Sequence, residues 1–379
     1  MLSFVATAVG QCDDPASYVP RTPEHVPPVR FRYVLHVVAP QTPGPEFHGQ
    51  FSPDSAEHLQ FLNIVMAGAE ERFRQNVPMR LPTSSEFIPD PRLRPVCEAV
   101  VFDYDDENWD LFADNDAGLR SRRAQNLYDK FVLKNPNSRK DALHFFVGEG
   151  KNGAHMATGL ACGVGCGAWA VGCTWYQHYV QGRNHWLPAS TLAHEFGHCM
   201  GLFHTVGKGF ALNDYCDDTP TYPQNPGCWN GENCSNNLMD YNADQRALTA
   251  CQIGRMHYYA MGKKGDFYKV VVPDWCDGGA PNVFIADSTT WNAEKRLHGG
   301  VEILPGAILT VRCTLHLPRD ASIIIRRGGK LVVEGGVITN LCGEYWAGIR
   351  LTRKRLRFAD HVRLLEGGKI ERAQALETL

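Results

Sequence analysis

The segment from His194 to His204, which reads HEFGHCMGLFH, constrains this chain more than any other part of its sequence. Two histidines four residues apart lie on one face of a helix, so His194 and His198 can reach the same cation. Gly201 can adopt a left-handed conformation at the end of that helix, which turns the chain and brings His204 back as a third ligand. The spacing therefore predicts a helix that ends near Gly201 and carries a metal site.

The predicted ligand set favours one catalytic zinc ion. Three neutral imidazole nitrogens, from His194, His198 and His204, leave a fourth position for water, whereas a structural zinc site is closed by four protein ligands. Glu195 lies beside these ligands in the sequence. A carboxylate in that place can take a proton from water as the water attacks a carbonyl group. We therefore expect Glu195 to be a general base.

A second signature follows the zinc motif. Residues 237–241 read NLMDY, which places Met239 35 residues after His204. HExxHxxGxxH followed by a methionine-containing turn resembles the metzincin metallopeptidases, in which this Met-turn forms a floor beneath the zinc. Within them the chain is similar to the pappalysin family, including cytophagalysin-like and ulilysin-like enzymes, over about residues 30–260. The segments that carry this likeness are GLFHTV, CDDTP, NLMDY and QIGRM.

The resemblance implies a fold and further site residues. The fold is an α/β (α+β) zinc protease domain with a mixed sheet and an active-site helix. By the resemblance, Tyr241 stabilises the tetrahedral intermediate, as a phenol donor can, and Asp244 lines the S1′ pocket and favours basic side chains. Family members also bind calcium in a loop, which suggests oxygen ligands here. The candidate calcium ligands are Asp214, Asp217, Asp218 and Thr219.

Hydrophobic periodicity before the motif predicts alternating strands and helices. We expect a β-α-β-α-β order, which indicates a mixed α/β layer. Residues 159–173, rich in Gly and Cys, suit an edge strand or a loop over a cleft, and 207–236 form a long loop. The predicted strands are 30–38, 96–104 and 142–147, and the predicted helices are 55–76 and 118–132.

The pattern changes after Pro273 to short β-rich runs separated by glycines. A chain of 379 residues suits two domains. We expect a leader or linker at 1–28, a metzincin-like protease domain at 29–273, and a small all-β module, β-solenoid-like or sandwich, at 282–379. Two or three repeats are visible in this module. Its isolated histidines, His298 and His316, are expected at the surface.

Thirteen cysteines favour disulfides and an oxidising compartment, so we expect a protein that is secreted, extracellular or periplasmic. The odd count leaves at least one cysteine outside the intrachain disulfides, and Cys199 in the helix motif is the best candidate. The apolar start of the chain suits the remnant of an export signal. The C-terminal part resembles β modules that follow proteases in some secreted bacterial proteins, which suggests a bacterial origin and attachment to a surface or large substrate.

The expected partners are protein or peptide substrates. A net charge of −3 does not indicate nucleic acid, and no apolar stretch is long enough to span a membrane. Two alternatives to a zinc endopeptidase stay open. One is a catalytically silent adhesion or binding protein with a retained zinc site, and the intact Glu195 argues against it. The other is a zinc amidase acting on small molecules, although long loops beside the site favour a polymeric substrate.

Overall fold

The computed structural model describes residues 12–44, 47, 49–110, 117–148, 159–161, 170–205, 214–219, 234–241, 244–352 and 357–378. These residues form two compact units, which we describe separately. The α/β unit is Pro28–Val272, and the β unit combines Pro273–Leu379 with the residues before Pro28. The predicted export-signal remnant and most of the predicted loop 207–236 lie outside the described residues.

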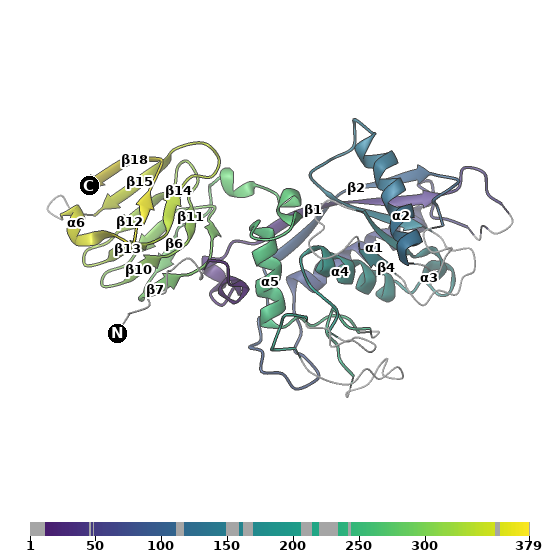
Figure 1. Ribbon diagram of the computed structural model, residues 1–379, viewed down its shortest axis with the longest axis horizontal. Coiled ribbons are helices and arrows are strands. Elements are labelled where there is room, and N and C mark those ends of the chain that lie inside the picture. The colour runs from purple at the N-terminus through teal and green to yellow at the C-terminus, as the bar shows by residue number, and fades with distance from the viewer. Residues whose placement is uncertain are drawn as a thin grey trace, which may run out of the picture. The chain divides into compact units, whose positions relative to one another are not determined.

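The α/β unit is built on a five-stranded sheet in the order β2-β1-β3-β5-β4 (Figure 1). The pairs β1–β2, β1–β3 and β3–β5 are parallel, and β4 joins β5 in the antiparallel direction. The mixed sheet and the fold class predicted from the sequence are confirmed. The strands are β1 Val29–Ala39, β2 Leu93–Tyr104, β3 Leu143–Gly148, β4 Gly159–Ala161 and β5 Ala170–Thr174.

The helices of this unit follow the predicted periodicity. Ser55 caps the first helix, because its side chain accepts a hydrogen bond from the backbone N–H of His58. None of the helices in the described part of the chain is long and apolar enough to cross a membrane. The helices are α1 Ala56–Arg74, α2 Ala117–Tyr128 with the π-helical turn η4 Asp129–Leu133, α3 Tyr176–Val180, α4 Trp186–Cys199, α5 Ala250–Ala260 and the 3-10 turn η5 Phe267–Val270.

Phe196, in the centre of the HEFGH sequence, fixes α4 against the sheet. Its fully buried ring lies 5.5 Å from the ring of Phe31 on β1 and 5.8 Å from that of Phe145 on β3, measured between centroids. Phe73 on α1 joins the same cluster. A helix anchored through Phe196 must present the side chains of its other face, including the histidines, away from the sheet.

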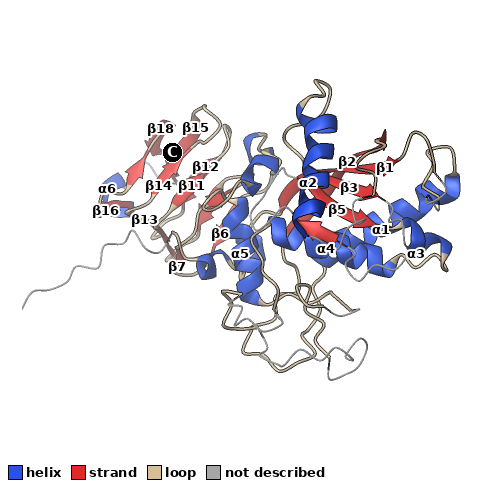
Figure 2. Ribbon diagram, turned by 45° about the vertical axis from the view of Figure 1, so that its right-hand side comes forward, coloured by secondary structure: helices blue, strands red, loops and turns tan. Residues whose placement is uncertain are grey.

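The β unit is a solenoid with three parallel sheets (Figure 2). All strand pairs among its described residues are parallel, which distinguishes it from an antiparallel sandwich. The first sheet contains β6 Val283–Ile285, β9 Val301–Ile303, β12 Ser322–Ile325, β15 Trp346–Leu351 and β18 Ala373–Thr378; the second, β7 Thr289–Trp291, β10 Ile308–Val311, β13 Lys330–Glu334 and β16 Val362–Leu365; the third, β8 Lys295–Arg296, β11 Thr314–His316, β14 Val337–Thr339 and β17 Lys369–Ile370. A short helix, α6 Phe358–His361, precedes β16.

Aligned apolar side chains form the solenoid core. Ile285, Ile303, Ile325 and Leu351 occupy the same register on successive strands, and all four are fully buried. Each sheet has at least four strands, so the expectation of two or three repeats was too low. Short rungs joined by turns of unequal length hide the period in the sequence.

The prediction of surface histidines in this unit was wrong. His316 is fully buried, where its Nδ1 accepts from the backbone N–H of Leu341 at 2.8 Å and its Nε2 donates to the carbonyl of Trp275 at 3.1 Å. His298 is partly buried beside Asp274. Turn backbone groups in a solenoid need partners, and a buried imidazole can supply both a donor and an acceptor.

Disulfides hold both units. Cys12 is bonded to Cys313 and Cys276 to Cys342 in the β unit, and Cys216 is bonded to Cys251 in the α/β unit. Three disulfides among the described residues are consistent with an extracellular protein. Cys199 is a buried thiol outside any disulfide, as expected. Cys12 anchors the segment 12–27, with its 3-10 turns η2 Pro15–Tyr18 and η3 Pro23–His25, to the β unit.

Candidate metal centre

The active-site helix ends where the sequence predicts. Gly201 has a φ of +88°, and the backbone N–H of Leu202 donates to the carbonyl of Gly197 at 3.0 Å. A β-carbon at Gly201 would also collide with the ring of Tyr259 on α5. Two factors therefore favour glycine at position 201: the left-handed backbone conformation and the close approach of α5.

The structure brings the three predicted ligands together. The Nε2 atoms of His194, His198 and His204 form a triangle with sides of 3.1, 3.1 and 2.9 Å. The centre of this triangle is about 1.8 Å from each nitrogen, so the three atoms are spaced to accept a zinc ion at the usual Zn–N distance of about 2.0–2.1 Å. This group of three histidines could hold a metal ion.

The other ring nitrogens are held by hydrogen bonds. Nδ1 of His194 lies 2.7 Å from the carbonyl oxygen of Leu238, and Nδ1 of His198 lies 2.9 Å from that of Leu202. A carbonyl can only accept, so each Nδ1 carries the hydrogen and each Nε2 keeps its lone pair for a cation. Nδ1 of His204 lies 2.7 Å from the hydroxyl of Tyr241.

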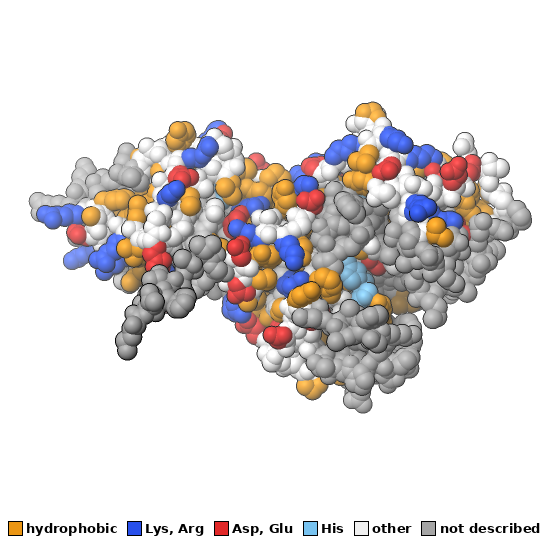
Figure 3. Space-filling model, in the orientation of Figure 1, with side chains coloured by type: hydrophobic (Ala, Val, Ile, Leu, Met, Phe, Trp, Pro, Cys, Tyr) orange, Lys and Arg blue, Asp and Glu red, His pale blue; other side chains and the backbone are white. Residues whose placement is uncertain are grey.

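Burial keeps these imidazoles neutral. Desolvation, reinforced by the neighbouring imidazoles, places the pKa of His194 well below its usual value and lowers the pKa of His204 to about 3. Burial also lowers the pKa of His198. Neutral imidazole is the form that binds zinc. In the space-filling view, histidine side chains reach the surface of the α/β unit (Figure 3).

Glu195 is buried beside the histidines with only 5% of its surface exposed. Its Oε2 atom has no hydrogen-bond partner among the described residues, while the carboxylate accepts from the backbone N–H of Ala161 on β4. A β-carbon at Gly159 would collide with Oε1 of Glu195. Burial raises the pKa of Glu195 to about 8. Strand β4 therefore fixes one oxygen of the Glu195 carboxylate, and the other oxygen has no hydrogen-bond partner among the described residues.

The role of β4 was not predicted from the sequence. The segment 159–173 suggests an edge strand or a loop over a cleft, and part of it does form β4 and β5. The contact between Gly159 and Glu195 joins residues 36 positions apart on different elements. The only signal in the sequence was the glycine itself, since glycine in a strand often marks the close approach of another group.

Met239 lies beneath the active-site helix. It is fully buried, and a β-carbon at Gly197 would lie 2.5 Å from its Sδ atom. Asn237 fixes the turn, because its Oδ1 accepts from the backbone N–H of Met239 at 2.8 Å and its side chain pairs with Gln252. The carbonyl that orients His194 belongs to the next residue, Leu238. The turn at Met239 and helix α4 therefore both position His194.

The predicted Asp244 has a cation partner within the chain. Its carboxylate pairs with the guanidinium group of Arg80, and 16% of its side chain is exposed. The buried Arg72 on α1 lies close enough for the Asp244 charge to raise the pKa of Arg72, although burial lowers that pKa overall, to about 10. A carboxylate expected to bind basic substrate side chains therefore already has a basic neighbour.

The described residues give the predicted calcium site no support. Asp214 accepts hydrogen bonds from the Thr219 hydroxyl at 2.8 Å and from the backbone N–H of Cys216 at 3.1 Å. Asp218 accepts from the backbone N–H of Cys251 at 3.0 Å. Cys216, Asp218 and Cys251 lie within reach of one point, but the two sulfurs are joined in a disulfide. Local hydrogen bonds thus account for both carboxylate oxygens of Asp214 and for Oδ2 of Asp218, whereas Oδ1 of Asp218 is buried without a hydrogen-bond partner among the described residues.

Residues 127–260 match a family model, that of peptidase family M43, described as pregnancy-associated plasma protein-A. The match supports a metzincin-type metallopeptidase. It spans α4, the three histidines, Glu195 and Met239, and a metallopeptidase of this type implies zinc. A search of the curated proteins finds no match. The cytophagalysin-like and ulilysin-like subgroup stays a prediction.

Proposed function

We propose that the α/β unit is a secreted zinc-dependent endopeptidase that hydrolyses protein or peptide bonds. The observation that supports this most is the convergence of three Nε2 atoms within 3.1 Å of one another, beside a buried carboxylate with one oxygen unpartnered among the described residues. The family match supports a peptide hydrolase that uses a metal. Endopeptidase specificity, the roles of single residues and the location outside the cell are the proposal.

His194, His198 and His204 would hold the zinc ion, with their Nδ1 hydrogen bonds fixing the ring orientations. Bound zinc supplies a Lewis acid that polarises a carbonyl group and lowers the pKa of water. Glu195, ionised because the charge of a nearby zinc ion would lower its raised pKa, would take the proton of the attacking water through Oε2 and pass it to the leaving amine. The N–H of Ala161 holds the carboxylate in place during both transfers.

Tyr241 would donate a hydrogen bond to the oxyanion that develops on the substrate carbonyl. In the structure its hydroxyl contacts Nδ1 of His204, and 53% of the residue is exposed. The phenol must therefore exchange this contact for the oxyanion as the substrate binds. An exposed side chain on a turn can make that rotation at low cost.

The test combines metal analysis with peptide cleavage by the full chain. We expect about one zinc per chain, cleavage of casein and of internally quenched peptides, loss of cleavage with a chelator, and recovery on adding zinc. Glu195→Gln should keep zinc while hydrolysis falls by about 100-fold or more. Glu71→Gln, an exposed glutamate on α1, is the matched control.

Two results would contradict the proposal. A zinc-loaded, folded protein that cleaves neither casein nor any library peptide would favour a silent binding protein or a small-molecule amidase. Cleavage that a chelator leaves unchanged would exclude the metal centre as its origin.

A further inference from the structure

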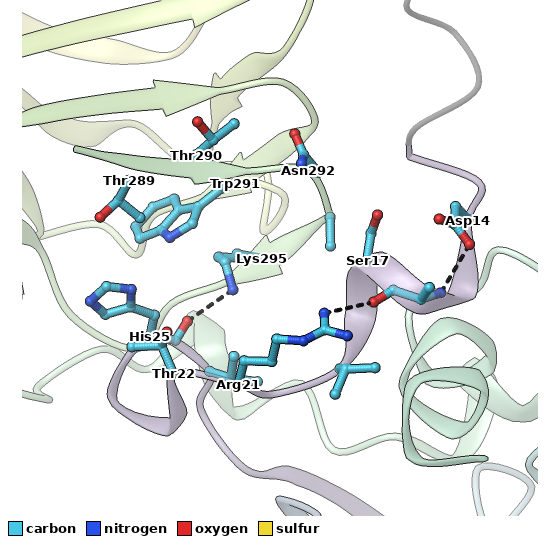
Figure 4. A pocket seen from close by; sticks show the side chains of 14 residues that line it. Asp14, Ser17, Arg21, Thr22, His25, Thr289, Thr290, Trp291, Asn292 and Lys295 are labelled. Atoms are coloured by element: carbon cyan, nitrogen blue, oxygen red, sulfur yellow. Dashed lines mark hydrogen bonds between the residues drawn. The ribbon is translucent and has the colours of Figure 1, made fainter. Parts of the chain in front are cut away.

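The β unit contains a cavity of about 430 Å³ between the N-terminal segment, residues 12–27, and the first rung of the solenoid. Its walls come from η2 and η3 on one side and from β7 and β8 on the other (Figure 4). This volume lies in the range of small-ligand pockets. The Cys12–Cys313 disulfide and the buried Tyr18, whose hydroxyl accepts from the backbone N–H of Glu294, hold the segment in place.

Lys295 extends into this cavity, and no counterion lies beside it among the described residues. Its ammonium group donates one hydrogen bond, to the carbonyl of His25 at 3.2 Å, and lies 5.4 Å from the centre of the Trp291 ring. An ammonium group has three donors. Within the described part of the chain no carboxylate contacts it, and burial lowers the pKa of Lys295 to about 8. Burial in the cavity therefore destabilises the charged form of Lys295, and an anionic ligand would stabilise it.

Trp291 supplies a second donor. Only 4% of the residue is exposed, and its indole N–H has no acceptor among the described residues. A buried donor without an acceptor is costly and rare. Figure 4 shows the Trp291 and Lys295 side chains pointing toward the N-terminal segment.

The remaining charged groups of the cavity leave it cationic. Arg21 lies on its wall and donates to the carbonyl of Ala16. Among the described residues that line the cavity, Asp14 is the one acidic residue, and its carboxylate accepts from the backbone N–H of Ala16 at 3.0 Å. Burial lowers the pKa of His25, which keeps that imidazole neutral.

We propose that this cavity binds a carboxylate, with the Lys295 ammonium and the Trp291 indole N–H as donors. The site offers one positive charge, on Lys295, and three unused hydrogens: two on the Lys295 ammonium and one on the Trp291 indole. These donors match an acceptor with one negative charge and two oxygens. The volume suits one acidic sugar or one acidic amino-acid residue. This site is separate in chemistry from the metal centre, so either can exist without the other.

The two sources of a carboxylate can be separated by calorimetric titration of the full chain at neutral pH. The probes are sodium glucuronate with glucose as its neutral counterpart, and N-acetyl-aspartate α-methylamide, which keeps only the side-chain carboxylate, with N-acetyl-asparagine methylamide as its neutral counterpart. We expect saturable binding of at least one acid, with its neutral counterpart weaker by about tenfold or more. Binding of glucuronate alone indicates an acidic saccharide, and binding of the aspartate methylamide alone indicates an acidic peptide.

Variants locate the binding. Lys295→Met keeps the apolar stem and removes the charge, so affinity should fall by about tenfold or more. Trp291→Phe keeps a ring and removes the N–H, and it tests the site even if Lys295→Met does not fold. Lys330→Met, at an exposed lysine on β13, is the matched control and should bind as the wild type does. The proposal is overturned if neither acid binds, if a neutral counterpart binds equally well, or if folded Lys295→Met and Trp291→Phe keep wild-type affinity.

Discussion

Gly159 on β4 approaches Oε1 of Glu195 so closely that no β-carbon fits between them. Gly159→Ala should therefore displace the carboxylate or the strand. We expect kcat/KM for a peptide to fall by about 10- to 100-fold with zinc content unchanged, because the metal ligands are not touched. Gly44→Ala, where nothing lies within 4 Å of the new β-carbon, is the control. Equal activity of the two variants would show that the contact is not needed.

His204→Ala should reduce both zinc content and hydrolysis, since it removes one of three nitrogens. His185→Ala, at an exposed histidine before α4, should affect neither. Metal analysis after dialysis against a weak chelator makes the comparison. Full zinc occupancy in His204→Ala would mean that His204 is not a ligand.

Substitutions of Asp244 and of Arg80 should change the cleavage specificity in opposite directions. If Asp244 lines the S1′ pocket, cleavage should favour Arg or Lys just after the scissile bond. Asp244→Asn should flatten that preference, whereas Arg80→Met should strengthen it by removing the competing cation. A peptide-library profile measures both. A wild-type profile dominated by large apolar residues at that position would reject the assignment.

Alanine substitutions at Gly201 and Gly182 distinguish two effects of an added β-carbon: backbone strain, and collision with a neighbouring side chain. Both glycines have positive φ, +88° and +128°, but only at Gly201 does a β-carbon meet another group, the ring of Tyr259. Gly182→Ala should cost about 1 kcal/mol of unfolding free energy. Gly201→Ala should cost about 1–3 kcal/mol more, from overpacking. Thermal unfolding of both variants provides the comparison, and equal losses would show that α5 yields without strain.

The β unit should not contribute to hydrolysis. We expect residues 28–272 alone to bind zinc and to cleave short peptides within a few-fold of the full chain, because the metal centre is built entirely from that span. The measurement is kcat/KM on one quenched peptide. A folded, zinc-loaded fragment that cannot cleave it would assign part of the active site to the β unit.

The sequence predicts what local rules determine. The 3.6-residue period of α1 and the left-handed Gly201 were both predicted from residue type and spacing, and both are confirmed. The approach of the histidines also follows from spacing, because a helix face and one turn fix their separation.

Features that depend on distant packing were not predictable. The residues next to His316 in the sequence do not indicate its burial, and those next to Arg80 do not indicate its pairing with Asp244, 164 residues away. The bond between Cys12 and Cys313 joins residues 301 positions apart, and no pattern around either cysteine indicates it. With thirteen cysteines, many pairings are compatible with the sequence, and only the fold selects among them.

The Cys12–Cys313 bond makes the chain a closed covalent loop that contains the whole α/β unit. A peptidase is exposed to its own activity. One cut anywhere between these cysteines opens the loop but leaves both fragments on the same molecule until the bond is reduced. Self-cleavage at a single site would thus be invisible by size under oxidising conditions, and a nicked enzyme would keep its solenoid attached.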